Sequence, residues 1–280
     1  MTAKPIDVWD VSTFDRELTA LLRAHEDLIR DYTTTDHHIF RDYDLGQGKG
    51  PYLYRSDNPH GAAFLRLKET VGQEMEGRTI RAFHYTRLTD VEVEGLLKQG
   101  IHPSTPDSLR TRLNSMVTAG HLTTDRAAAL YKASPFHGEQ LEARDGKFWM
   151  TSYPHVVDDP GVVRLMRHWG GEVASWFLED DDQILAPLSE IGKPRIIEVA
   201  VPLALTRRSY SAGEAIIAAF GRYMGLATGK HDFDLYTIAP LEPSAILKVH
   251  GEWDASFAAM GRGYPRRYVA PDTVPTDEDS

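Results

Sequence analysis

The segment that most constrains the fold of this chain runs from residue 78 to residue 88 and reads Arg-Thr-Ile-Arg-Ala-Phe-His-Tyr-Thr-Arg-Leu. Its β-branched and aromatic residues suit a pleated, half-buried surface, which predicts a strand over 79–86. Thr89 stands where a helix N-cap belongs, acidic residues follow in the first turn, and Gly100 can close that helix. Polar groups at a strand end are held rigidly and can face a ligand, and here they are His84, Tyr85 and Thr86. The alternative is a core histidine with one satisfied hydrogen bond.

Composition narrows the class of protein. The 280 residues suffice for one large domain, or for one domain with a substantial extension, and the hydrophobic share of 41% is ample for a core. The formal charge of −10 disfavours sequence-independent binding to a phosphate backbone. No cysteine occurs, so disulfides, thiolate zinc sites and a cysteine nucleophile are excluded. No apolar run approaches the length of a membrane span, and the first residues lack the apolar middle of a secretory signal, so we expect a soluble, cytoplasmic protein.

The N-terminal quarter of the chain has the pattern of helices. Ser12 begins a segment like a capping box, and apolar residues then follow at helical spacing to about Asp31. Residues 33–60 are polar and contain three glycines, which indicates a long connection with a strand-like piece at 52–54. A further helix is expected to start at Asn58-Pro59. We therefore divide the chain into a helical N-terminal extension (1–75), a main domain (76–268) and a disordered acidic tail (269–280).

Further strands are expected in the main domain, separated by short helices. The strand segments are 147–153, 195–201, 235–238 and 245–250. Helices are expected near 106–118, from 123 or 124, from Asp159-Pro160, and from Ser211, where Glu214 occupies the capping-box position. Strands before, between and after helices, without regular βαβ alternation, predict an α+β fold.

The order of these segments resembles the ADP-ribosyltransferase fold, in the branch with a His–Tyr–Glu triad that includes poly(ADP-ribose) polymerases and diphtheria-toxin-like enzymes. His84-Tyr-Thr86 and the helix after it resemble the His-x-Thr strand of that family. Residues 146–152 (Gly-Lys-Phe-Trp-Met-Thr-Ser) resemble its Gly-Lys-Gly-Ile-Tyr-Phe-Ala strand, and residues 196–201 resemble the next core strand. Residues 234–240 (Asp-Leu-Tyr-Thr-Ile-Ala-Pro) resemble its final Glu-Tyr-x-Val-Tyr strand.

This resemblance implies a split mixed β-sheet core that consumes NAD as a substrate. His84 would donate hydrogen bonds to the adenosine ribose, and Asp234 stands where the family has its catalytic glutamate. The remaining positions would line the NAD pocket or stack on nicotinamide, which is cationic and binds aromatic faces: Tyr85, Thr86, Trp149, Ser152, Tyr153 and Trp169. The glycosidic bond of NAD breaks through an oxocarbenium-like ribose, so a nearby carboxylate stabilises the developing charge.

The chain departs from the family pattern at the acid. Asp234 is one methylene shorter than glutamate, and Asp232, Glu242 and Glu172 are alternatives. Glu172 follows Gly170-Gly171, where the backbone can approach a ligand closely, although glycine pairs more often mark surface turns. The two tryptophans have an alternative role in core packing, because large aromatic side chains dominate cores.

The resemblance implies a mono-ADP-ribosyltransferase of the bacterial toxin or effector type, acting on a protein or nucleotide acceptor, with an antitoxin or other regulatory partner. Two other functions remain open. A degenerate transferase fold could bind NAD or a partner without catalysis, because fold alone does not decide function. His231-Asp232 together with Asp234 could suggest a metal-dependent phosphohydrolase, but no His-Glu-x-x-His and no second cluster at ligand spacing occurs.

Overall fold

The computed structural model describes residues 4–44, 56–174 and 182–265. Its α-helices are α1 (Arg16–Ala24), α2 (Glu26–Asp44), α3 (Gly61–Glu76), α4 (Asp90–Gln99), α5 (Pro106–Thr118), α6 (Thr124–Ala133), α7 (Leu141–Arg144), α8 (Pro160–Arg167), α9 (Asp182–Glu190), α10 (Ala212–Tyr223) and α11 (Ala255–Ala258). Its strands are β1 (Thr79–Leu88), β2 (Phe148–Thr151), β3 (Lys193–Pro202), β4 (Thr206–Arg207), β5 (Asp234–Thr237) and β6 (Ile246–Gly251). No helix in the described ranges is long and apolar enough to cross a membrane.

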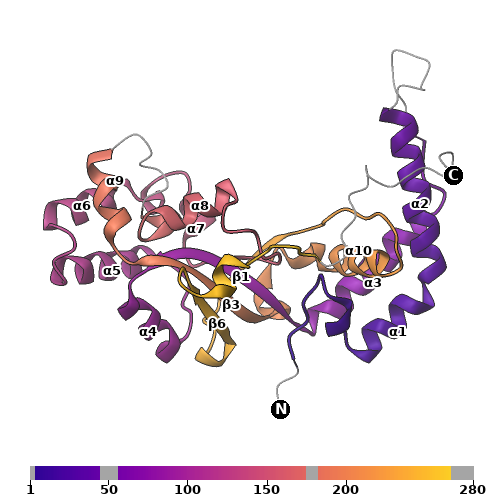
Figure 1. Ribbon diagram of the computed structural model, residues 1–280, viewed down its shortest axis with the longest axis horizontal. Coiled ribbons are helices and arrows are strands. Elements are labelled where there is room, and N and C mark those ends of the chain that lie inside the picture. The colour runs from indigo at the N-terminus through magenta and orange to yellow at the C-terminus, as the bar shows by residue number, and fades with distance from the viewer. Residues whose placement is uncertain (1–3, 45–55, 175–181, 266–280) are drawn as a thin grey trace.

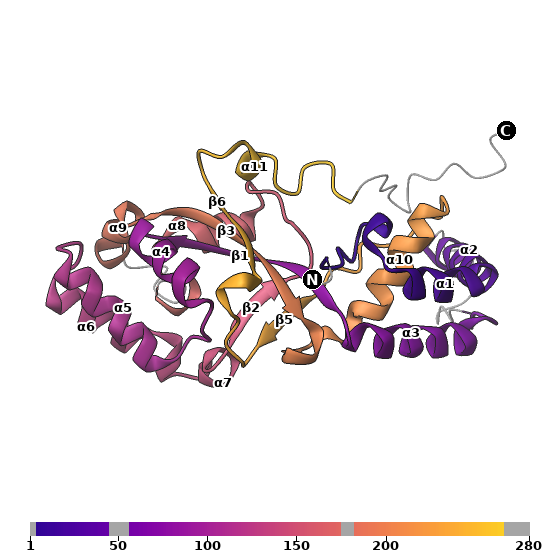
Figure 2. The ribbon, with the colours of Figure 1, turned by 90° about the horizontal axis from the view of Figure 1, so that it is seen from below.

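The strands form one sheet in the order β4-β5-β2-β1-β3-β6, at the centre of an elongated molecule (Figures 1 and 2). Every pair of neighbouring strands is antiparallel, so the expectation of a mixed sheet is wrong. Within the described part of the chain, the one parallel contact outside the named strands is a bridge between Ile6 and Ile80. The coarser expectation, a chain of mixed α and β structure with helices between the strands, is confirmed.

Most of the predicted helices and strands are present, but residues 33–44 of the connection predicted over 33–60 are helical. Helix α2 continues to Asp44, because residues 26–44 contain no glycine or proline and keep apolar positions at helical spacing. One of those positions, Tyr32, stacks on Phe64 of α3 with ring centroids 3.7 Å apart. The strand-like piece at 52–54 lies outside the described residues.

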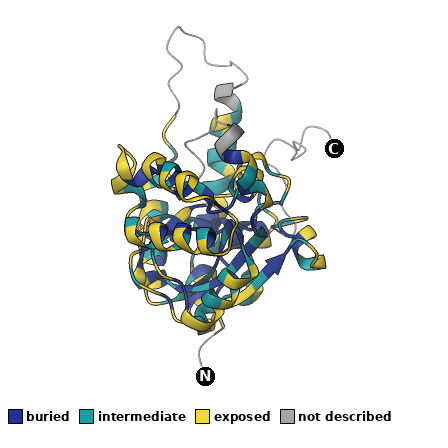
Figure 3. Cartoon of the chain, turned by 90° about the vertical axis from the view of Figure 1, so that its left-hand side faces the viewer, coloured by how far each residue is buried: buried dark blue, intermediate teal, exposed yellow. Residues whose placement is uncertain are grey.

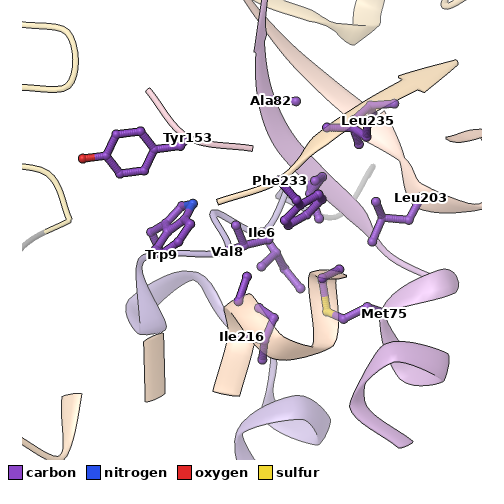
Figure 4. Packing of buried hydrophobic residues seen from close by; sticks show 14 of the residues in the cluster. Ile6, Val8, Trp9, Met75, Ala82, Tyr153, Leu203, Ile216, Phe233 and Leu235 are labelled. Atoms are coloured by element: carbon purple, nitrogen blue, oxygen red, sulfur yellow. The ribbon is translucent and has the colours of Figure 1, made fainter. Parts of the chain in front are cut away.

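The N-terminal helices share one hydrophobic core with the sheet. Residues preceding α1 pair with β1, since the Ile6 amide donates to the Thr79 carbonyl at 2.9 Å. Trp9, next along the chain, packs edge-on against Tyr153, and its indole N–H donates to the Ser152 carbonyl at 3.1 Å. Figure 4 shows part of this core, in which residues from the N-terminus, α3, α10 and the strands β1, β2, β3 and β5 meet. The boundary predicted near residue 75 therefore falls inside a continuous apolar core.

The two faces of the sheet carry different layers. Side chains alternate along a strand, so one face carries Ala82, Met150 and Leu235, which belong to the core shared with α3 and α10. We call it the Ala82 face. The opposite Phe83 face carries Phe83, Thr151 and Asp234, and α8 and α11 pack on it. A further core lies among α5, α6, α9 and Trp169 at the other end of the molecule. Seen from that end, the helices carry both exposed and buried residues (Figure 3).

Candidate functional site

The sheet opens between its two central strands. Strand β1 pairs with β3 over its whole length, from Thr79 to Leu88, but it pairs with β2 at one position, Phe83 with Thr151. Next to that position, the Trp149 carbonyl of β2 is bound by the imidazole of His84 at 2.8 Å. A side chain thus takes the place of a ladder hydrogen bond, and the two strands separate around it.

His84 lies on the Ala82 face, half-buried, with its ring 4.4 Å from the ring of Phe148. Because a carbonyl only accepts, Nδ1 carries the proton that binds Trp149, and Nε2 of the neutral ring is an acceptor. Removal from water lowers the pKa of His84 to about 4; the positive charge of Arg112 acts in the same direction, while the hydrogen bond to Trp149 opposes them. The imidazole is therefore neutral at pH 7.

The segment Trp169-Gly170-Gly171-Glu172 turns sharply beside β1. Both glycines have positive φ, 85° and 58°, and a Cβ on Gly170 would lie 2.4 Å from the Cβ of Ala174. A Cβ on Gly171 would lie 3.7 Å from the hydroxyl oxygen of Thr86, so this turn sits directly against the strand that carries His84. The two glycines allow a backbone path that other residues rarely adopt.

Trp169 anchors the turn. It is fully buried, and its indole N–H donates to Oε2 of Glu92 at 2.8 Å. Glu92 also completes the capping box of α4 with Thr89 and binds Nε of Arg112 at 2.9 Å. The Arg112 guanidinium lies 4.8 Å from the centre of the Trp169 ring. Trp169 is thus a core residue, as its alternative interpretation predicts. Through Glu92 it also helps to hold Arg112, whose positive charge lowers the pKa of His84.

Glu172 turns toward a second arginine. Its Oε2 lies 3.0 Å from Nε of Arg144, the last residue of α7, and both side chains are less than a third exposed. The carbonyl of the preceding residue, Ala143, accepts the indole N–H of Trp149 at 2.9 Å.

These contacts close into a ring. His84 binds the backbone carbonyl of Trp149, and the indole of Trp149 binds the carbonyl of Ala143. The next residue, Arg144, pairs with Glu172. Gly171, which precedes Glu172, lies against Thr86, two residues beyond His84 on the same face of β1. We call this set the His84–Glu172 ring. It brings together four residues selected from the sequence, which are His84, Thr86, Trp149 and Glu172. The pair of Arg144 with Glu172 is part of the ring, and Trp169 connects it to the pair of Arg112 with Glu92.

Asp234 lies outside this ring. It pairs with Thr151 on β2, so its side chain leaves the sheet on the Phe83 face, opposite to His84. The residue is exposed, although partial removal of its carboxylate from water raises its pKa. On the same face, Trp149 and Tyr236 lie with rings 4.7 Å apart, and the Arg208 guanidinium is 5.3 Å from the Trp149 ring.

The other residues selected from the sequence have partners in the protein core. The Tyr85 hydroxyl donates to the His155 carbonyl at 3.1 Å, and burial raises its pKa. The Ser152 hydroxyl accepts the Phe233 amide at 3.1 Å, and the Tyr153 hydroxyl donates to the Tyr264 carbonyl. These three contacts hold the sheet to adjoining segments and place no free polar group in the ring.

Sequence reasoning missed Arg112 and Arg144, because an arginine on a helix surface carries no signal of its own. The one hint was the spacing of Glu92 from Thr89, which marks a capping box and therefore a glutamate held in place. Arg208, with φ of 65°, was equally invisible, since only the backbone reveals a left-handed arginine.

Comparisons with protein-family models, with curated proteins and with solved structures give no match. Within the described ranges, no group of three or more histidine and carboxylate side chains could hold a metal ion. His231 instead contacts Glu214, with Nδ1 and Oε1 3.4 Å apart.

Proposed function

We propose that the chain has an ADP-ribosyltransferase-like fold and is an NAD-consuming mono-ADP-ribosyltransferase of the toxin or effector type, with the His84–Glu172 ring as its active site. The observation that carries the proposal is the closed ring itself, a series of contacts that links the strand histidine through Trp149 and Arg144 to the Glu172 carboxylate, next to the opening between β1 and β2. The separation of β1 from β2 also supports the split sheet that such a fold requires.

Each part of the ring suits one part of NAD. The acceptor nitrogen Nε2 of His84 can accept a hydrogen bond from a ribose hydroxyl, instead of donating one as expected. The half-buried Trp149, whose side chain lies on the Phe83 face beside Tyr236, offers an aromatic face to the flat nicotinamide ring. A guanidinium has five N–H donors, more than one carboxylate uses, so Arg112 and Arg144 can bind phosphate oxygens while they stay paired with glutamate.

Glu172 is the carboxylate best placed for the chemistry, in preference to Asp234. When the bond between C1′ of the ribose and the nicotinamide nitrogen breaks, the electron pair leaves with neutral nicotinamide and positive charge develops on the ribose. A fixed carboxylate stabilises that charge. The acceptor then bonds to C1′ and loses its proton to a base. The ion pair with Arg144 holds Glu172 in one position for this role.

Incubation with NAD labelled on the adenylate tests the proposal. We expect release of free nicotinamide, transfer of label to a protein or nucleotide acceptor, and an upward shift of the unfolding temperature with NAD. His84→Gln should weaken NAD binding, whereas His121→Gln, a change at an exposed histidine, should leave it unaltered. NAD binding without nicotinamide release would instead support the non-catalytic alternative. The absence of any thermal shift would contradict both functions.

A further inference from the structure

A second polar cluster lies on the Phe83 face, away from the ring. His250 of β6 is 4% exposed and lies between two oxygen-bearing side chains. Its Nδ1 is 2.8 Å from the hydroxyl oxygen of Ser256, and its Nε2 is 3.0 Å from Oε2 of Glu198 on β3. The ammonium of Lys248 lies 2.9 Å from the same hydroxyl oxygen of Ser256.

The donors and acceptors of this cluster fit an arrangement of protons in which the imidazole of His250 is neutral. Lys248 has donors only and therefore donates to the Ser256 oxygen. The ionised carboxylate of Glu198 only accepts, so Nε2 of His250 carries the ring proton. Nδ1 is then an acceptor, and it receives the Ser256 hydroxyl proton. In this arrangement the Ser256 hydroxyl, the His250 imidazole and the Glu198 carboxylate are connected in the order required for general-base activation of a hydroxyl.

The carboxylate at the base of the cluster is held firmly. Oε1 of Glu198 accepts from Nε of Arg81 at 2.6 Å, and Arg81 also binds Asp7 at 3.0 Å. Burial alone would raise the pKa of Glu198, but the hydrogen bonds from His250 and Arg81 outweigh it and lower that pKa to about 2. Glu198 therefore stays ionised and fixes both the orientation and the tautomer of His250.

The opposite end of the cluster reaches the surface. Ser256 is half-buried in the short helix α11, and Lys248 is exposed, whereas His250 is enclosed. We propose that Ser256 is the nucleophile of a second, esterolytic site, with His250 as general base, Glu198 as the residue that orients it, and small carboxylic esters as the substrate class. Relative to the serine proteases, the two ring nitrogens of the histidine exchange roles. This site is independent of the NAD chemistry proposed above.

The reaction is an ordinary acyl transfer. Nδ1 of His250 takes the hydroxyl proton while the Ser256 oxygen bonds to the ester carbonyl carbon, and the ammonium of Lys248 is placed to donate to the oxyanion. The carbon–oxygen bond to the alcohol then breaks, and His250 returns the proton to that alcohol. Water repeats the sequence on the acyl-serine and releases the carboxylic acid.

A fluorophosphonate probe tests the proposal directly, because it bonds to an activated serine oxygen and releases fluoride. We expect the full chain to be labelled, with the adduct on the peptide that contains Ser256 in mass spectrometry. Ser256→Ala should abolish labelling and the hydrolysis of p-nitrophenyl acetate, and His250→Gln should lower both strongly. Ser244→Ala, a change at an exposed serine close to β6, should leave both unchanged.

The mass-spectrometric readout uses the unaltered chain, so it decides the proposal even if a variant fails to fold. A chain that stays unlabelled, or an adduct located on another residue, would overturn the proposal and reduce Ser256 to a structural partner of His250. Labelling of Ser256→Ala equal to that of the unaltered chain would overturn it as well. None of these outcomes bears on NAD turnover.

Discussion

The two polar clusters lie on opposite faces of the same central strand and differ in how completely their charges are paired. On the Phe83 face, Arg81 binds Asp7 and Glu198, and Glu198 binds the enclosed His250. We call these four residues the Glu198 network. On the Ala82 face, His84 binds a backbone carbonyl, and the charge that acts on its imidazole is that of Arg112. The network holds segments together and at the same time fixes the orientation of His250, whereas the ring holds together turns and helix ends beside the opening of the sheet.

The difference follows from where each cluster obtains its partners. Members of the Glu198 network come from β1, β3, β6 and the N-terminal segment, so the network ties four distant parts of the chain together. Most members of the His84–Glu172 ring come from turns and helix ends, which contribute fewer buried apolar side chains than the strands do. We therefore expect changes in the network to affect stability first, and changes in the ring to affect binding first.

The largest effect on stability is expected for Glu198→Ala. It leaves Arg81 and His250 without their shared acceptor at a site where the carboxylate is 14% exposed, which should cost about 3 kcal/mol. Glu172→Ala should cost much less, because Glu172 is twice as exposed. Urea unfolding of both variants measures this contrast, with the exposed Glu69→Ala as control. Equal losses for Glu198 and Glu172 would erase the distinction between the two clusters.

The two clusters are expected to change the stability of the fold in different pH ranges. The pKa of Glu198 falls from 4.5 to about 2 on folding, so its stabilisation is present above pH 4.5 and is lost as the pH falls toward 2. The shift corresponds to about 3 kcal/mol. The pKa of His84 falls from 6.5 to about 4, so the unfolded chain takes up a proton first and stability declines between those pH values.

Urea unfolding at a series of pH values measures the contributions of Glu198 and His84 to the free energy of unfolding. Glu198→Gln should flatten the decline below pH 4.5, and His84→Gln should flatten the one between pH 6.5 and 4. If His84→Gln leaves the upper decline intact, desolvation of the imidazole is not its cause.

Gly170→Ala probes the turn that bears Glu172. A methyl group there would meet the Ala174 side chain at 2.4 Å, and φ is 85°. Gly120→Ala is the matched control, because its φ of 75° is equally left-handed but no atom lies within 4 Å of the added carbon. We expect the control to lower the free energy of unfolding by roughly 1–2 kcal/mol, and Gly170→Ala to lower it by roughly 1–3 kcal/mol more. Thermal unfolding of the two variants measures the cost of the contact with Ala174 alone. Equal losses of stability in both variants would show that the turn shifts to accommodate the methyl group.

The smallest effect is expected at Arg208, which adopts left-handed φ of 65° beside the Trp149 ring. Arg208→Gly should relieve that strain and stabilise the fold by about 1 kcal/mol. If the Arg208 guanidinium also binds NAD beside Trp149, the same change should weaken NAD binding. Titration with NAD and thermal unfolding together decide whether the strain is retained for binding.

Local signals in the sequence predicted much of the fold. The strand that carries His84, the capped helix after it and the glycine pair at 170–171 all depend on residues close together in the chain. Helix α2 was missed beyond Asp31, because a polar helix that packs through few apolar contacts resembles a loop in composition.

The arrangement of the site was less predictable, because it depends on register. Asp234 lies on the face opposite to His84 because it pairs with Thr151, and a shift of one residue would reverse that face. The pairing of Arg144 with Glu172, and of His250 with Glu198, joins residues 28 and 52 positions apart. No spacing rule connects such residues before the strands are aligned.

Nicotinamide release by Glu172→Gln and Asp234→Asn, compared side by side with the unaltered chain, tests the central claim most directly. We predict that Glu172→Gln lowers turnover by roughly 100-fold or more, as loss of a transition-state charge partner does. Asp234→Asn, and the control Glu139→Gln at an exposed glutamate, should stay near the unaltered rate. Normal turnover in Glu172→Gln, or its loss in Asp234→Asn, would contradict the assignment of the active site to the His84–Glu172 ring.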